Sequence, residues 1–436
     1  MSANIPLNPV AFVRKYDDLW NRILFLLGAL IVYRFGSHIP IPGINPIQLE
    51  NFFSSQEGTI LSMLNMFSGG ALERMSIMAL GIMPYISASI IVQMMSAVLP
   101  SLEALKKEGE SGRRQLNKYT RQGTLALAFV QAMAMSTGLI AGGLTLTTGL
   151  TFYLPAVTSL VAGAMFLMWL GEQITERGVG NGISMLIFAN IVAGTPSMIF
   201  QSFEQVKRGE MHLITLFVFM MIGIAVTAAI VYIERAQRRV PVNYAQKQQQ
   251  GRKVYAQQQS HLPLKINMAN VIPAIFASAL LMVPASLSQW AGRAEGDGLG
   301  HQILQTVVLA LSPGQPMYLA VFGIMIIFFC YFYTALVFSP REVAQNLKSS
   351  GAYIPGIRPG QQTERYLDHV LNRLTFIGAI YMTIICLMPL IVQSSFGVPF
   401  NVGGTSLLIM VVVVMDFIAQ LQAHLMTHQY NDQGLI

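Results

Sequence analysis

The chain has 436 residues, of which 53% are hydrophobic and only 11% are charged. Soluble domains carry about 25% charged residues, so this composition leaves too few charges to cover the surface of a soluble protein. It also excludes a disordered chain, which needs low hydrophobicity and high charge. Lys and Arg outnumber Asp and Glu, which gives a net charge of +7. The composition therefore predicts a polytopic membrane protein.

Ten apolar stretches have the length of membrane-spanning helices, which need about 20 residues. They fall at 23–40, 75–98, 123–141, 153–171, 183–200, 212–233, 268–289, 317–338, 374–393 and 404–424. The first stretch ends in HIPIPG (38–43), without the small-residue pattern of a cleaved signal peptide, so we expect it to be a retained span. An even number of spans places both termini on the same side.

Lys and Arg are unevenly divided between the segments that connect these stretches. One set of alternate segments holds 22 of them, and the opposite set holds three. Cytoplasmic loops of membrane proteins carry the excess of Lys and Arg. We therefore expect both termini to be cytoplasmic, with an N-terminal segment over 1–22 and a short tail over 425–436.

Two of the basic segments, 234–265 and 340–373, are too long to be mere connections. The first has a Gly251-Arg252 turn signal between short strand-like runs, which is typical of a protruding hairpin. The second has two Pro-Gly pairs on either side of Arg358, which favour tight turns. A face attracted to anionic lipids would explain the charge. A docking platform for an acidic or RNA-containing partner would explain it equally.

The segment 60–70 is apolar and too short to cross a membrane, and it ends in Ser68-Gly69-Gly70. A broken apolar segment at membrane depth is tolerated only where it packs in protein or lines a cavity. A re-entrant packing element and a movable part of a pore both meet this condition, and the residues alone leave both open.

The predicted spans hold few ionisable residues. Asp416 lies in the last span, and Glu172 and Glu176 lie at the edge of the fourth. Ion-coupled transporters and intramembrane enzymes usually need such groups at the middle of the membrane. The sequence also has no nucleotide-binding loop or metal-ligand motif, so we expect no enzymatic activity, cofactor or metal. A conduit with an uncharged centre is favoured over the alternative, a solute carrier built from inverted repeats.

Seven motifs, in order along nearly the whole chain, resemble the SecY family of bacterial protein-conducting channel subunits. They are NMFSGGAL (65–72), LGIMPYISASI (80–90), KEGESGRR (107–114), GEQITERG (171–178), VIPAIFAS (271–278), IRPG (357–360) and GGTSLLI (403–409). The resemblance implies an all-α membrane protein with ten transmembrane helices. These would form two inverted five-helix halves, over 23–200 and 201–424, around an hourglass pore.

The resemblance also implies a function and assigns residues to it. The chain would translocate unfolded secretory polypeptides across the bacterial cytoplasmic (inner) membrane and release transmembrane segments sideways into lipid. The implied pore constriction consists of Ile82, Ile86, Ile187, Ile191, Ile275 and Ile409. The implied plug, near 60–74, includes Asn65, Phe67, Ser68, Gly69 and Gly70. The implied lateral gate, between the second and third and the seventh and eighth spans, includes Ser87, Gln93 and Ser278.

The local pattern is compatible with the implied constriction. Ile82 and Ile86 are four residues apart, as are Ile187 and Ile191, so each pair points the same way from its helix. Isoleucine also has a restricted χ1 angle, which suits a rigid apolar constriction that seals a pore.

The last implication concerns partners. SecE and SecG would be the membrane partners, and the SecA ATPase or the ribosome, through its rRNA and exit-site proteins, would drive the channel. Signal sequences and nascent membrane proteins would be the clients, and anionic lipids would contact the basic side. The implied docking residues are Arg358, Arg238, Arg239, Arg252, Lys253 and Lys348. No Lys or Arg follows Arg373, so we expect no contacts between the tail and cytosolic partners.

Overall fold

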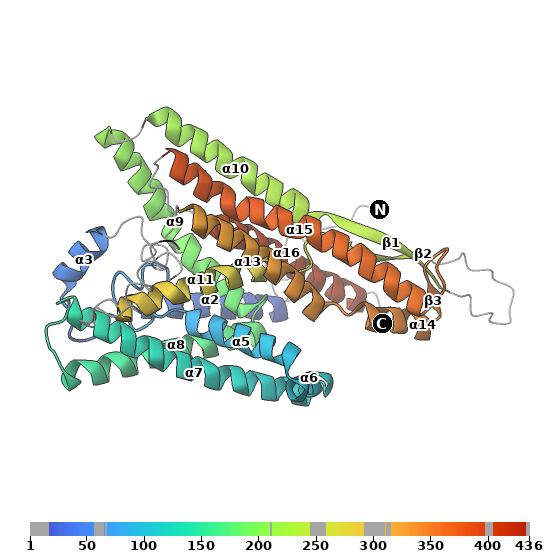
Figure 1. Ribbon diagram of the computed structural model, residues 1–436, viewed down its shortest axis with the longest axis horizontal. Helices are drawn as coiled ribbons and strands as arrows, with labels where there is room; N and C mark the ends of the chain where they lie inside the picture. Colours follow the sequence, from blue (N-terminus) through green and yellow to red (C-terminus); the bar gives the residue numbers. More distant parts are fainter. Residues whose placement is uncertain are drawn as a thin grey trace.

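The computed structural model describes residues 17–55, 65, 68–209, 212–244, 259–291, 310, 315–396 and 404–432 (Figure 1). Its long helices are α2 (Asp17–Gly36), α5 (Met83–Val98), α7 (Glu110–Ala141), α8 (Leu150–Arg177), α9 (Gly182–Arg208), α10 (Leu213–Arg235), α11 (Ile272–Ala291), α13 (Pro316–Val337), α15 (Gln361–Phe396) and α16 (Gly404–Asp432). The shorter helices are α3 (Pro46–Ser55), α6 (Pro100–Lys107) and α14 (Pro340–Ser349). The strands are β1 (Gln237–Tyr244), β2 (Gln259–Lys265) and β3 (Ala352–Tyr353).

Each of the ten predicted spans coincides with one of the long helices. Among the described residues, eight helices are long and apolar enough to cross a membrane, and α5 with α6, bent by 102°, adds a ninth. In α11, Ile272–Leu281 counts as a shorter apolar helix. The predicted helical membrane fold is therefore confirmed.

The predicted start of the second span is wrong. The sequence places it at residue 75, but α5 begins at Met83. Met75 and Gly81 have positive φ angles of 44° and 58°, which interrupt a helix, and Pro84 favours the first helical turn. Residues 68–82 form turns instead. Ile82 thereby becomes the N-cap residue of α5, and its carbonyl accepts the Ile86 amide at 3.0 Å.

Two strands pair within 234–265 as the predicted hairpin requires, and they belong to a larger unit, while the predicted Gly251-Arg252 turn lies outside the described residues. β1 pairs antiparallel with β2, from Gln237 opposite Lys265 to Asn243 opposite Gln259. β3, from the second basic segment, pairs with the other edge of β1, which gives the order β2-β1-β3. Val240 and Val242 alternate inward along β1 onto a small apolar core of their own. The two basic segments therefore fold as one body, at one end of the molecule (Figure 1).

The long helices pack as two consecutive groups. In the first, α2 packs on α8, α5 on α7, α7 on α8 and α8 on α9. In the second, α10 packs on α16, α11 on α13, α13 on α15 and α15 on α16. The groups meet along two seams. At one seam α9 packs on α10 and α16, and at the other α11 packs on α5 and α7. One large buried apolar cluster fills the space between the groups.

Candidate functional site

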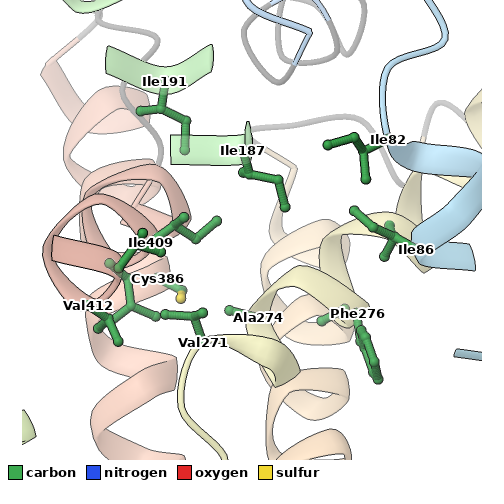
Figure 2. Close-up of a cluster of buried hydrophobic side chains, with 14 of the residues drawn as sticks. Ile82, Ile86, Ile187, Ile191, Val271, Ala274, Phe276, Cys386, Ile409 and Val412 are labelled. Atoms are coloured by element: carbon green, nitrogen blue, oxygen red, sulfur yellow. The ribbon is translucent and has the colours of Figure 1, made fainter. Parts of the chain in front are cut away.

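The isoleucines expected at a constriction come together where the two groups of helices meet (Figure 2). Ile82 and Ile86 come from the start of α5, Ile187 and Ile191 from α9, and Ile409 from α16. These five are buried in one cluster, and Ile409 is fully inaccessible to solvent. Ile275, on α11, is partly buried and packs against the same cluster. We call these six residues the isoleucine ring.

Further apolar side chains, which the sequence reasoning missed, surround this ring. They are Val271, Ala274 and Phe276 before and on α11, Cys386 on α15 and Val412 on α16 (Figure 2). No periodicity in the sequence separates them from ordinary core residues. Cys386 and Cys330 are buried free thiols. The side chains of this cluster offer nothing that replaces the hydration shell of an ion.

The turn expected in the plug is held together locally. The Asn65 side chain donates from Nδ2 to Glu73 Oε2 and accepts the Glu73 amide at Oδ1, both at 3.0 Å. The Ser68 hydroxyl donates to the Asn65 carbonyl at 2.9 Å and accepts the Leu72 amide at 3.1 Å. Phe67 and residues 56–64 lie outside the described residues. The described part is thus a compact turn rather than an extended loop.

This turn rests on α2 and α9, next to the isoleucine ring. The Tyr33 hydroxyl donates to Asn190 Oδ1 and lies 3.4 Å from the Ser68 carbonyl oxygen. Arg34 donates from Nη1 to the Gly69 carbonyl at 2.9 Å. A Cβ atom on Gly69 would lie 2.8 Å from Asn190 Oδ1, and φ there is +66°, so glycine is required. We call Tyr33, Arg34 and Asn190, with this turn, the α5 anchor.

The sequence reasoning did not find Tyr33 or Asn190. Both are 2% exposed, and Asn190 directly precedes Ile191 of the ring. A single amide in the middle of an apolar helix was an available signal, because such groups must find a partner when buried.

The residues expected in a lateral gate lie on α5 and α11, the helices that pack against each other at one seam. Ser87 and Gln93 are on α5, and Ser278 is on α11. Gln93 donates to the Ser89 hydroxyl at 3.0 Å, and Ser278 donates to the Ile275 carbonyl at 2.9 Å, so both bonds stay within one helix.

A polar contact crosses the same seam nearby. Lys106 on α6 donates from Nζ to the carbonyl oxygen of Leu336, in the last turn of α13, at 3.0 Å. Carbonyls in the last turn of a helix lack intrahelical partners, and a cation is favoured at that end. This bond therefore joins α6, which follows α5, to α13, which packs on α11.

One of the two glutamates at the edge of the fourth span, Glu172, forms an ion pair. Arg121 on α7 contacts Glu172 on α8 through two bonds, of 3.0 Å and 2.7 Å. This bidentate geometry joins the two helices and occupies both oxygens of the Glu172 carboxylate.

The residues expected to dock partners surround the three-stranded sheet. Arg238 and Arg239 are exposed on β1, and Lys348 is exposed on α14. Arg358 is exposed in the turns between β3 and α15, where Gly356 and Gly360 have φ angles of 82° and 105°. These positive angles confirm the tight turns predicted from the Pro-Gly pairs. Arg252 and Lys253 lie outside the described residues.

Two groups of membrane-length helices that meet around a buried apolar ring, with a glycine turn packed beside it, define a membrane channel. The SecY family model matches residues 76–418. Protein translocase subunit SecY of Pseudomonas aeruginosa is 62% identical over 415 residues, which cover 95% of this chain and 93% of that protein. Protein translocase subunit SecY of Escherichia coli (strain K12) is 57% identical over 418 residues, with 95% and 93% covered. The chain belongs to the SecY family.

Solved structures of similar fold support the same architecture. "The structure of a protein conducting channel" has a TM-score of 0.65 and 16% identity, and the match covers 98% of this chain and 96% of that one. "Sec61 in the Canine ribosome-channel complex from the endoplasmic reticulum" has a TM-score of 0.62 and 15% identity, with 98% and 96% covered. At these identities the match concerns the fold alone.

Proposed function

We propose that this chain is the channel subunit of a bacterial protein translocase. It conducts unfolded secretory polypeptides across the cytoplasmic membrane and releases transmembrane segments sideways into lipid. The observation that carries this proposal is the isoleucine ring, because its members come from both groups of helices and close the junction between them. A ring formed in this way opens when the two groups move apart.

The chemistry of the ring suits a polypeptide rather than a small polar solute. Its side chains make no directional bonds, so they can fit around any sequence that passes, while they exclude ions by dewetting when the passage is empty. The α5 anchor places a turn of the plug against the same helices. In the closed state the ring and the turn together form the seal.

The seam between α5 and α11 is the proposed lateral gate. Apolar contacts are similar in energy to contacts with lipid tails, so parting such a seam within a bilayer costs little. Ser87 and Gln93 belong to α5 and Ser278 to α11, the two helices of this seam, and an apolar signal sequence would insert between them. The Lys106–Leu336 bond closes the end of the seam.

The three-stranded sheet with α14 is the proposed docking platform, on the cytoplasmic side that the basic segments define. Exposed Arg238, Arg239, Lys348 and Arg358 give it a positive face, which suits acidic protein surfaces and RNA phosphates. SecA and the ribosome are the proposed driving partners, SecE and SecG the proposed membrane partners, and anionic lipids contact this side. Both termini are cytoplasmic in this arrangement.

The experiment reconstitutes the chain, with SecE and SecG, in proteoliposomes and adds SecA, ATP and a labelled precursor. Transport of the precursor into a protease-protected space, with no uptake of labelled small solutes, is the expected result. Uptake of a small solute without precursor transport would replace the proposal with the solute-carrier alternative.

A further inference from the structure

A partly buried polar cluster precedes α11, the helix that carries Ile275 and Ser278. Asn267 donates from Nδ2 to Glu234 Oε1, on α10, at 2.6 Å, and Asn270 donates from Nδ2 to Asp416 Oδ2, on α16, at 2.7 Å. Glu234 is 8% exposed and Asn267 is 4% exposed. Two carboxylates of two different helices therefore hold the short loop from which α11 starts. We call these four residues the α11 anchor.

The loop itself is built to present both amides. Asn270 has a φ of 57°, in the left-handed region that asparagine tolerates better than most residues. Its carbonyl oxygen accepts a second bond from Asn267 Nδ2 at 3.1 Å. The Asn270 Oδ1 atom is buried without a hydrogen-bond partner within the described structure. An orphaned acceptor is costly, so the conformation is maintained by the bond that Asn270 makes to Asp416.

The α11 anchor occupies the same place in its group of helices as the α5 anchor does in the other group. The turn before α5 is bound by α2 and α9, which are the first and last spans of the first group. The loop before α11 is bound by α10 and α16, which are the first and last spans of the second group. In both cases the helix that follows the anchored loop contributes to the isoleucine ring.

We propose that Asn270 and Asp416 position α11 in the closed channel, supported by Asn267 and Glu234. Asp416 follows Ile409 on α16 by seven residues, about two helical turns, so both lie on the same face. Asn270 precedes Ile275 by five residues. The Asn270–Asp416 bond thus sets where Ile275 meets Ile409. This proposal rests on the proposed function, since it gives the ring the task of closing the channel.

The test exchanges the amide of Asn270 and the carboxylate of Asp416 between the two positions. Asn270→Asp alone places two carboxylates against each other, which pushes α11 away from α16. Asn270→Asp combined with Asp416→Asn again joins an amide to a carboxylate. The readout is the rate at which a water-soluble maleimide labels the reporter Ile275→Cys, which all proteins in the experiment carry. The native thiols are 2% and 0% exposed and contribute little.

The single variant should label about tenfold faster than the reference, because a hydrogen bond to a charged group is worth at least that factor. The exchanged pair should return to the reference rate. Asn346→Asp, the same change at an exposed position on α14, should have no effect. Equal labelling of the single variant and the reference overturns the proposal, as does an exchanged pair that labels as fast as the single variant.

A second pair of variants keeps the proposal testable where Asn270→Asp prevents folding. Asp416→Asn retains a neutral acceptor for the Asn270 amide and should label more slowly than Asp416→Leu, which removes the acceptor. Equal rates for these two variants overturn the proposal. Precursor transport by the reference protein is measured in parallel, so that a failure of the proposed function is seen separately from a failure of the anchor.

Discussion

The turn before α5 and the loop before α11 hold equivalent helices in different chemical ways. Before α5, the Tyr33 hydroxyl bonds to the Asn190 amide and the Ser68 carbonyl, and Arg34 bonds to the Gly69 carbonyl. Before α11, amide side chains bind carboxylates of Glu234 and Asp416. The two anchors share their place in the fold, but the bonds that tie them to neighbouring helices share no residue type except asparagine.

The difference between the anchors explains how two halves of the chain can share one architecture without a detectable sequence repeat. A loop needs buried polar partners on the first and last helices of its half, and many residue pairs satisfy that need. The contacts also differ in the number of bonds to charged groups. The α11 anchor has two bonds to carboxylates, whereas among the bonds that tie the α5 anchor to neighbouring helices only the Arg34 bond to the Gly69 carbonyl carries a charge. Charge-assisted bonds are stronger than neutral ones, so we expect the α11 anchor to stay closed while the α5 anchor releases its turn during opening.

The largest expected effect is the loss of precursor transport when the docking platform is changed. This variant leaves both anchors intact, so it distinguishes their role from that of docking. Arg358→Glu reverses a charge in an exposed turn, where substitutions alter stability little. The closed channel should keep its low ion conductance, while SecA-driven precursor transport should fall at least tenfold, the effect of about 1.4 kcal/mol of lost binding. Normal transport by a correctly inserted variant would remove Arg358 from the platform.

The next largest effect is a rise in ion conductance when the isoleucine ring is changed. Helices held by both anchors contribute to this ring. Ile409→Asn places an amide among apolar side chains, which costs about 1–3 kcal/mol if it stays unpaired. Hydration of the pore relieves this cost, so ion conductance in a bilayer without precursor should rise about tenfold. Ile409→Leu, which keeps the volume, should change little. Equal conductance for Ile409→Asn and the wild type would take Ile409 out of the constriction.

A smaller effect tests the α5 anchor with two neighbouring glycines. Gly69→Ala introduces a Cβ atom 2.8 Å from Asn190 Oδ1, whereas at Gly70 the nearest atom is Arg74 Nη1 at 3.9 Å. Both residues have positive φ, so both variants carry about 1–2 kcal/mol of backbone strain. Only Gly69→Ala should also displace the turn and raise ion conductance several-fold above Gly70→Ala. Equal conductance would show that the turn does not depend on Asn190.

The smallest effect concerns the polar end of the seam between the halves. Lys106→Gln weakens the bond to Leu336, which lies in an exposed region and contributes about 0.5–1 kcal/mol. Transport of a precursor with a weakened signal sequence should rise about twofold. Lys107→Gln removes the same charge one residue away and is the matched control. An equal rise in both variants would assign the effect to charge alone.

Composition and motif resemblance predicted the ten helices and the isoleucine ring, because the length of an apolar stretch and a short motif both depend only on residues that are consecutive in the sequence. The hairpin and the turns around Arg358 followed from Gly and Pro, which limit the backbone directly. Neither anchor could be predicted. Tyr33 and Asn190 are 157 residues apart, and Asn270 and Asp416 are 146 apart, so their pairing depends on the folded arrangement. The start of α5 was missed because hydropathy does not register the positive φ of Met75.

In the proposed function a translocating polypeptide passes through the isoleucine ring, and photo-crosslinking can test this path. A photoreactive residue replaces Ile187 in one sample and Ile224, which is 62% exposed on α10, in another. A radiolabelled precursor is then stalled during SecA-driven transport by a folded C-terminal domain. We predict adducts between the precursor and position 187, and none at position 224. Adducts at position 224 with none at position 187 would contradict a path through the ring.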